Sequence, residues 1–278
     1  MTWRYVGAPD VRVPLPLRIL GLWRHRRLLR RMAERDLRQR YVGTAGGVAW
    51  AAVYPLLLVT FYTAIFTFVF RGRLSPGAPP AEYALYVVSG LLPWISFADV
   101  AGRATQVMAE HRGLAKFAMF PVQVLPLTSL YTTAFSLGVG LLALIVFAAS
   151  SHGISAGILL LLPAVVLQTL FLAGIAWLLG ALGALIRDVR ELVSIALLVG
   201  MFLTPIFYAE SDAPRVLRPL VALNPLAHLI RLYRTALLGG GGPDTLVSLL
   251  VFGAVAVVTP LVGYRVFERT RALLGDVL

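Results

Sequence analysis

Asp99 is the only acidic residue within the long apolar stretches of this 278-residue sequence. A charge at membrane depth costs about 2.5–3.5 kcal/mol even on the lenient insertion scale, so such a residue often marks catalysis or ion coupling. Asp99 lies near the end of its stretch, where water reaches it, and a structural role there is the competing interpretation. No second acidic residue accompanies it. The histidines (His25, His111, His152 and His228) lack metal-ligand spacing.

Arginines gather before the first apolar stretch, where residues 1–45 contain eleven of them. Residues 15–40 alternate apolar and basic side chains, which predicts a helix in the headgroup layer with a break near Arg24–Arg27. Guanidinium groups bind lipid phosphates bidentately, although an ordinary basic membrane anchor has the same composition. The candidate phosphate-binding residues are Arg35, Arg38 and Arg40.

Aromatic side chains cluster in two apolar stretches, 46–70 and 192–209. Trp50, Tyr54 and Phe61 lie at i, i+4 and i+11, so they share one helical face. Sugar rings stack their C–H faces on aromatic rings, so such a face would let a polysaccharide slide; packing and interfacial belts explain the pattern equally well. The candidate channel residues are Trp50, Tyr54, Phe61, Tyr62, Phe202, Phe207 and Tyr208.

Several chemistries are excluded by the sequence. No segment matches the P-loop pattern G-x-x-x-x-G-K-[ST], and the single lysine is Lys116, so the chain cannot hydrolyse ATP in that way. The chain has no cysteine, which excludes disulfides. We expect no cofactor in this chain and no enzymatic activity. A net charge of +12 would suit nucleic acid, but the arginines lie at the ends of apolar stretches and instead indicate topology.

The composition predicts an all-α integral membrane protein. Hydrophobic residues make up 59% of the chain and charged residues 14%, with a mean hydropathy of +0.82, whereas soluble domains carry about 25% charged residues. Six stretches approach the length that crosses a hydrocarbon core of about 30 Å, although the second and fifth are short. The six spans are expected at about 46–70, 83–101, 122–149, 155–186, 192–209 and 245–264.

The distribution of basic residues predicts that both termini are cytoplasmic. With the N-terminus inside, the inner connections contain 19 lysines and arginines and the outer ones 6. The N-terminus also lacks the short apolar core of a cleavable signal peptide. The expected division is a cytoplasmic segment with an interface helix at 1–45, a six-span domain at 46–267 and a cytoplasmic tail at 268–278.

The outer segment 210–243 is predicted to contain two short helices. Asn224-Pro225 is a strong helix start, and Gly239 ends the helix. One apolar face is formed by Leu226, Leu229, Ile230, Tyr233 and Leu237. Asp212 is expected to cap a shorter helix from Ala213. Neither helix is long enough to cross, so we expect a re-entrant hairpin in the outer leaflet, with a structured external loop as the alternative.

The inner connection 102–121 mixes charged and apolar residues over one or two helical turns, which suits docking into a groove of a partner protein.

Several short motifs, in the same order, resemble permeases of O-antigen and teichoic-acid ABC exporters, to which capsule permeases are related. Each motif is weak alone, but together they run from residue 35 to the C-terminus. They are Arg35–Thr44 leading into Trp50 and Tyr54-Pro55-Leu56, Phe120-Pro121, Val124–Leu127, Arg187–Arg190, Leu203–Tyr208, Leu223–Ile230 and Leu274–Leu278.

The resemblance implies a homodimer in the bacterial inner membrane, working with two ATP-binding cassette subunits that bind ATP and Mg²⁺. It implies a substrate made of polysaccharide on a lipid pyrophosphate, and membrane lipids around the spans. Arg35, Arg38 and Arg40 would then meet the pyrophosphate. The segment that couples to the ATPase would contain Glu110, His111, Arg112, Gly113, Leu114 and Lys116.

Three other classes stay open at this point. A drug or small-lipid efflux permease would share the architecture. A secondary flippase would need no ATPase. A membrane enzyme acting on lipid-linked sugar would need a catalytic acid, for which Asp99 is the one obvious intramembrane candidate.

Overall fold

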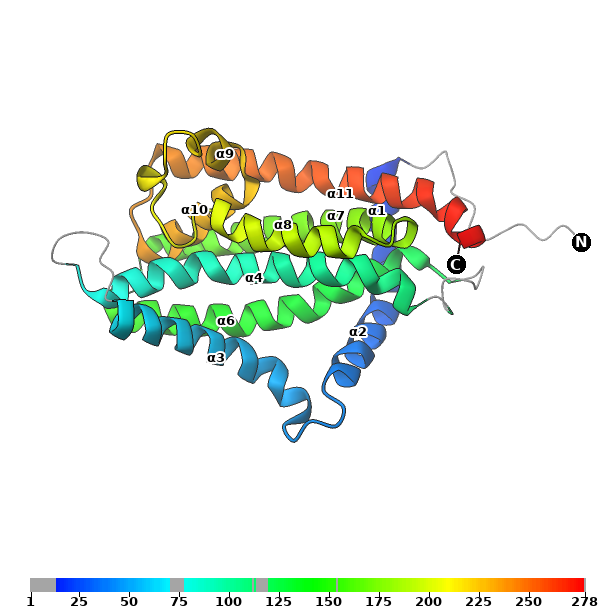
Figure 1. Ribbon diagram of the computed structural model, residues 1–278, viewed down its shortest axis with the longest axis horizontal. Helices are drawn as coiled ribbons and strands as arrows, with labels where there is room; N and C mark the ends of the chain where they lie inside the picture. The colour runs from blue at the N-terminus through cyan, green and yellow to red at the C-terminus, as the bar shows by residue number, and fades with distance from the viewer. Residues whose placement is uncertain (1–13, 71–77, 112, 114–119, 154, 278) are drawn as a thin grey trace, which may run out of the picture.

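The computed structural model describes residues 14–70, 78–111, 113, 120–153 and 155–277, and this part of the chain is helical, with no strand. Long helices lie side by side along the long axis, while α2 slants away to a corner from which α3 returns (Figure 1). The helices are α1 (Leu15–Gly21), α2 (Arg26–Arg40), α3 (Trp50–Ala64), α4 (Pro80–Glu110), α6 (Thr128–His152), α7 (Leu161–Leu185), α8 (Val189–Leu203), α9 (Arg218–Leu223), α10 (Pro225–Leu238) and α11 (Pro243–Val277).

Short 3-10 segments extend several of these helices. They are Leu22–His25, Gly47–Ala49, Val122–Leu127, Ala156–Leu160 and Glu210–Asp212, and α3 continues into a π-helical segment at Ile65–Phe70. The stretch 15–40, expected to be helical with a break near Arg24–Arg27, forms α1 and α2 with the 3-10 segment Leu22–His25 between them.

Five helical stretches of the described chain are long and apolar enough to cross a membrane, and they correspond to the first four predicted spans and the sixth. They are Gly47–Phe70, Pro80–Glu110, Val122–Ser151, Ala156–Leu185 and Pro243–Thr270. Two helices run further than the apolar pattern: α4 continues to Glu110, and α11 passes residue 268 without a break.

The predicted fifth span, 192–209, corresponds to α8 and a non-helical segment that follows it. Helix α8 has 15 residues, or about 22 Å at 1.5 Å per residue. It ends at Leu203 because Thr204 precedes Pro205 and is extended, with φ −88° and ψ 135°; the proline ring disfavours helical geometry in the preceding residue.

Helix α4 is the central helix of the bundle. In its most apolar stretch 72% of the residues are buried, against 17% in α3. It packs against α6 and α7. The side-chain amide of Gln168 in α7 donates a hydrogen bond to the carbonyl oxygen of Pro93 in α4 (3.3 Å). Pro93 itself has no backbone N–H to donate. By contrast, α3 leaves most of its surface to lipid or to another protein.

Glycines bring α7 into backbone contact with both α4 and α11. A Cβ on Gly174 would overlap the backbone of Thr259 and Pro260 in α11, and one on Gly263 would overlap the backbone of Gly174. On the other side of α7, a Cβ on Gly183 would overlap Thr105 of α4. Small residues allow this close approach, which is how helices pack tightly in lipid.

Helix α1 is attached to the bundle. Arg18 forms an ion pair with Glu268 of α11 at 2.9 Å. Leu15 and Ile19 pack on the cluster that contains Tyr264 and Phe267. The C-terminal part of α11 and the basic helix α1 therefore lie at the same end of the bundle (Figure 1).

At the opposite end, α10 begins where the sequence predicts it. The side chain of Asn224 accepts a hydrogen bond from the amide of Leu226 (3.0 Å), and Pro225 occupies the first helical position. Gly239 ends the helix with φ +82°, a left-handed conformation that favours glycine.

The short helix predicted from Ala213 to about Ala222 begins later than expected, and the predicted cap by Asp212 is wrong. Asp212 ends a 3-10 turn, Ala213 is extended with ψ 132° because Pro214 follows it, and α9 starts only at Arg218.

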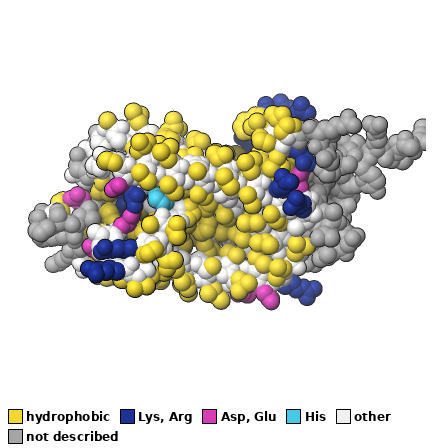
Figure 2. Space-filling model, turned by 90° about the horizontal axis from the view of Figure 1, so that it is seen from above, with side chains coloured by type: hydrophobic (Ala, Val, Ile, Leu, Met, Phe, Trp, Pro, Cys, Tyr) yellow, Lys and Arg dark blue, Asp and Glu magenta, His cyan; other side chains and the backbone are white. Residues whose placement is uncertain are grey.

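The surface has an apolar middle and charged ends. Figure 2 shows hydrophobic side chains across the centre of one face and basic and acidic side chains towards both ends. This distribution is expected of a protein whose middle lies in hydrocarbon.

Candidate functional site

A polar cluster joins α4 to α6 near the end of the bundle that carries α1 and α2. Arg103 of α4 forms an ion pair with Asp99 one turn earlier. The same guanidinium donates to Thr132 and Thr133 of α6, both at 2.6 Å. Thr133 in turn donates to the Asp99 carboxylate at 2.6 Å. Both threonines are buried, so the carboxylate and the guanidinium are held by a network rather than by one contact.

Arg40, the last residue of α2, is the weakest member of this cluster. Its guanidinium lies 3.4 Å from the Asp99 carboxylate, and its side chain is 46% exposed. Arg40 is thus the one contact of the cluster that comes from α2 and the one that is most open to solvent.

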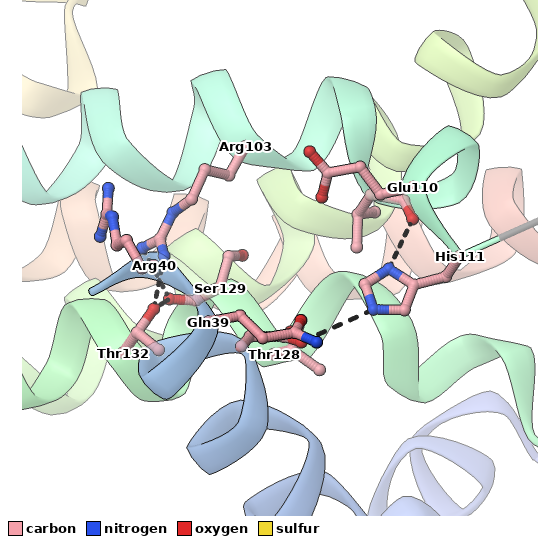
Figure 3. A pocket seen from close by; sticks show the side chains of 10 residues that line it. Gln39, Arg40, Arg103, Glu110, His111, Thr128, Ser129 and Thr132 are labelled. Atoms are coloured by element: carbon pink, nitrogen blue, oxygen red, sulfur yellow. Dashed lines mark hydrogen bonds and ion pairs between the residues drawn. The ribbon is translucent and has the colours of Figure 1, made fainter. Parts of the chain in front are cut away.

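The polar cluster borders a cavity of about 440 Å³ between α2, α4 and α6. In Figure 3, Arg103 points from α4 towards Ser129 and Thr132 of α6, and Arg40 approaches from α2. The walls combine guanidinium, hydroxyl and carboxylate groups. Such a lining binds anionic or hydroxyl-rich groups.

A second cavity, of about 640 Å³, lies between α3, α4 and α6 and also has Arg40 in its wall. Its polar end is formed by Arg40, Asp99 and Thr133, and its body by apolar residues such as Leu58 and Leu91. It therefore joins a charged end to an apolar body.

A third cavity, of about 660 Å³, is bordered by Arg35, Asp36, Glu110 and His111. Among the predicted phosphate-binding residues, Arg35 lines this cavity, Arg40 lines the other two, and Arg38 is exposed and lines none of the three. The structure brings Arg35 and Arg40 to neighbouring cavities and leaves Arg38 apart.

His111 links the end of α4 to α2. Its Nε2 lies 3.7 Å from the carboxylate of Asp36, and its Nδ1 lies 3.0 Å from the carbonyl oxygen of Val107. The Asp36 carboxylate beside Nε2 raises the pKa of His111 above its ordinary value. Partial burial opposes this rise, and the Val107 carbonyl and the charge of Glu110 add to it. The contact is thus strengthened when His111 is protonated.

The predicted coupling residues are described in part. Glu110 ends α4 and is exposed, His111 caps the helix, and Gly113 is exposed. Arg112, Leu114 and Lys116 lie outside the described residues.

The predicted channel aromatics fall into two groups. Phe61 and Tyr62 connect to Phe207 through Phe66, with centroid separations of 6.1, 6.4 and 6.2 Å along the chain of rings, and Phe207 lies 6.2 Å from Phe202.

Trp50 and Tyr54 lie towards the other end of α3, and within the described residues neither ring contacts this row. Both are exposed, at 39% and 57%, as is Phe61 at 61%. Tyr54 and Tyr62 line the second cavity. Tyr208 is half-buried, and its hydroxyl donates to the carbonyl of Phe202 (3.3 Å).

Sequence reasoning missed Arg103, Thr132 and Thr133. Arg103 follows the end of the second apolar stretch and was therefore assigned to the inner connection 102–121. The two threonines fell inside the predicted third span, 122–149. Arg103 and Asp99 are four residues apart, the spacing of an ion pair on a helix, and this signal would have found the pair.

The profile of the family described as "ABC-2 type transporter" matches residues 27–238. The chain belongs to this family. It is 29% identical over 255 residues to the O-antigen export system permease protein RfbA of Myxococcus xanthus, covering 90% of this chain and 95% of that protein. It is 24% identical to the protein of the same name from Klebsiella pneumoniae, covering 89% and 93%. It is 23% identical to the polysialic acid transport protein KpsM of Escherichia coli, covering 85% and 90%.

Family membership and the five apolar helical stretches together make this chain a multi-pass membrane protein. Both the first and the second cavity fall within the part of the chain that the family profile matches.

Proposed function

We propose that this chain is the membrane subunit of an ATP-driven exporter that moves a lipid-linked, O-antigen-like polysaccharide from the cytoplasm across the bacterial inner membrane. The observation that carries this proposal is the similarity to the Myxococcus xanthus O-antigen export permease, which extends over nearly the whole of both chains. The more distant similarity to a polysialic acid transport protein supports capsular polysaccharide as the alternative cargo; teichoic acid remains a further one.

In this proposal the chain crosses the membrane six times with both termini in the cytoplasm. Helix α8 and the non-helical segment 204–209 make the fifth crossing, and α9 and α10 form the re-entrant hairpin between the fifth and sixth. The excess of basic residues in the inner connections supports this orientation. So does the position of α1 beside the C-terminal part of α11, because it puts the first described helix and the end of the last one on one side.

Energy comes from separate ATP-binding subunits, which bind ATP and Mg²⁺, since the chain contains no P-loop. Two copies of this chain and two such subunits make the exporter. The segment 110–116 docks on the ATPase, and movement there reaches the cavities because His111 contacts Asp36 of α2. A ligand or partner shifts such an equilibrium only through contacts that differ between two states.

The substrate meets Arg35, Arg38 and Arg40 through its pyrophosphate and the aromatic residues through its sugars. Support comes from Arg35 and Arg40 at the cavities and from the ring contacts that run from Phe61 to Phe202. Stacking on successive rings binds a glycan at many weak points, so the glycan moves along the rings without being held tightly at any one of them. The exposed face that carries Trp50, Tyr54 and Phe61 lines the path between two copies.

The test is reconstitution of the permease with its ATP-binding subunit in liposomes, with ATP-dependent movement of lipid-linked glycan as the readout. Replacing residues 110–114 by glycine and serine should abolish transport while membrane insertion and dimer formation persist. Parallel reactions with O-antigen and polysialic acid substrates assign the cargo. Transport by the permease alone, without the second subunit, would contradict the proposal.

A further inference from the structure

The cavity of about 640 Å³ between α3, α4 and α6 has a charged end and an apolar body. Arg40 and Tyr41, at the corner between α2 and α3, lie at the charged end with Asp99. Leu58 and Val59 of α3 and Leu91 and Leu92 of α4 line the body. A cation next to an apolar slot is complementary to a lipid, which carries an anionic head group at the end of a hydrocarbon chain.

We propose that this cavity binds the head-group end of a polyprenyl diphosphate lipid, and that Arg40 exchanges Asp99 for the diphosphate when the lipid enters. The inference rests on the proposed function for the identity of the lipid. It adds a binding site within one protomer, behind α3, and a specific exchange of ion-pair partners.

The contacts of Asp99 make this exchange feasible. Its carboxylate is paired with Arg103 and accepts from Thr133 at 2.6 Å, so it stays satisfied when Arg40 leaves. The Arg40 contact is the longest of the three, at 3.4 Å, and is 46% exposed on the arginine side. An exposed ion pair contributes about 0–1 kcal/mol, whereas guanidinium binding to phosphate is bidentate and charge-assisted. The diphosphate therefore competes well for Arg40.

The depth of the site matches a head group. Asp99 lies 19 residues after the start of α4 at Pro80, or about 28 Å along the helix at 1.5 Å per residue. A hydrocarbon core is about 30 Å thick. If Pro80 marks one membrane surface, Asp99 and Arg40 lie close to the other, at the level of lipid phosphates.

The volume sets how much of the lipid is held. Pockets for small ligands measure about 300–1,000 Å³, and this cavity, at about 640 Å³, is in the middle of that range. It accommodates the diphosphate and the first isoprene units, while the remainder of a long chain extends into the bilayer beside α3, whose surface is largely unburied.

The experiment measures binding of fluorescent polyprenyl diphosphate to the purified permease in phosphatidylcholine nanodiscs, without the ATP-binding subunit. Arg40→Ala should weaken binding about tenfold or more, because a charge-assisted contact is lost. Asp99→Asn should tighten it by about two- to fivefold, since the competing charge is removed. Ser136→Leu, which places a larger side chain in the cavity wall, should weaken it about fivefold or more.

The matched control is Arg31→Ala, which removes the same charge from the same helix at an exposed position outside the three cavities. Its binding should equal that of the unmodified protein. Unlabelled polyprenyl diphosphate should displace the probe, whereas inorganic pyrophosphate, the uncharged polyprenol and phosphatidylglycerol should displace it at least tenfold less well.

Equal weakening by Arg31→Ala and Arg40→Ala would mean general charge attraction and overturn the site. Weakening by Asp99→Asn would overturn the exchange, and equal displacement by phosphatidylglycerol would overturn the assignment to the polyprenyl lipid. Normal transport by a Ser136→Leu protein that no longer binds the probe would reject this cavity and leave the exporter function standing. If the unmodified protein binds the probe but shows no ATP-driven transport, the exporter function is rejected and the binding cavity stands.

Discussion

Arginines near opposite ends of the bundle have opposite environments. Arg234 of α10 is 8% exposed, donates to the carbonyl oxygens of Ile206 (2.8 Å) and Tyr86 (3.3 Å), and lies over the ring of Tyr86, 3.4 Å from its centroid. Space for it exists because residue 90 is glycine, where a Cβ would come within 3.2 Å of the guanidinium. Arg40 is 46% exposed and has one contact of 3.4 Å.

The difference separates a fixed cation from an exchangeable one. Removing Arg234 takes the side-chain donor from the buried Ile206 carbonyl and the cation from the face of Tyr86, although the Tyr86 carbonyl keeps the Ser89 hydroxyl (2.9 Å). Removing Arg40 leaves Asp99 with Arg103 and Thr133. Arg234 therefore joins α10, α4 and the segment after α8, whereas Arg40 has a partner that manages without it.

The largest stability effect is expected for Arg234→Met. The buried Ile206 carbonyl loses its donor and Tyr86 loses the cation over its ring, so the free energy of unfolding should fall by about 2–4 kcal/mol. Thermal unfolding in detergent micelles measures this as a lower midpoint. Arg215→Met, at an exposed position nearby, is the control and should change little. A midpoint for Arg234→Met equal to that of the control would remove the distinction between the two arginines.

Arg103→Ala should have the next largest effect, a loss of about 1–3 kcal/mol in unfolding free energy. Its side chain bridges α4 to buried threonines of α6, but it is 29% exposed and Asp99 keeps two other partners. Arg103→Lys, with one ammonium in place of the planar fork, should recover only part of this loss. Full recovery would show that charge alone matters at this position. Unfolding in detergent compares the three proteins.

Arg40→Ala tests the comparison further, because it should leave stability nearly unchanged and still reduce transport. The unfolding free energy should change by less than about 1 kcal/mol, as for other exposed ion pairs. ATP-dependent glycan export in liposomes should nevertheless fall at least tenfold. Unfolding measurements and transport assays on the same preparation test this together. A stability loss as large as that of Arg103→Ala would make Arg40 a structural residue.

The smallest effect concerns His111 and Asp36. Because Asp36 raises the pKa of His111 above its ordinary value of 6.5, the stabilising contact is fully present below about pH 6.5 and is lost as the pH rises through the raised pKa. Amide exchange in α2, corrected for intrinsic rates, should therefore accelerate between pH 6 and 8. Asp36→Asn should flatten this dependence; an unchanged slope would exclude the pair as its cause.

Helix ends that depend on neighbouring residues could be predicted from the sequence, whereas those that depend on distant contacts could not. Asn224-Pro225 and Gly239 determine the ends of α10 through their own backbone preferences, so the sequence alone was enough. The extension of α4 to Glu110 was missed because hydropathy predicts only the part of a helix that lies in lipid. A helix continues past that part wherever its backbone hydrogen bonds and tertiary contacts support it.

The candidate site could be predicted only in part. Arg35 and Arg40 were named as candidates from their chemistry, but the ion pair between Arg40 and Asp99 joins residues 59 positions apart, and only tertiary packing brings them together. The same holds for Arg103 and Thr133. Asp212 was assigned to a cap from its residue type, and Pro214 overrode it through the backbone of Ala213.

The glycine contacts of α7 have a mechanical consequence. At Gly174 and Gly263 the backbones of α7 and α11 touch, and at Gly183 the backbone of α7 touches α4, so rotation of any of these helices would turn a Cβ into a neighbouring backbone. Close backbone contact of this kind favours movement of the three helices as one unit. A crosslink between α7 and α11 should therefore leave transport intact, whereas one between α4 and α3, the least buried of the long helices, should slow it if α3 moves.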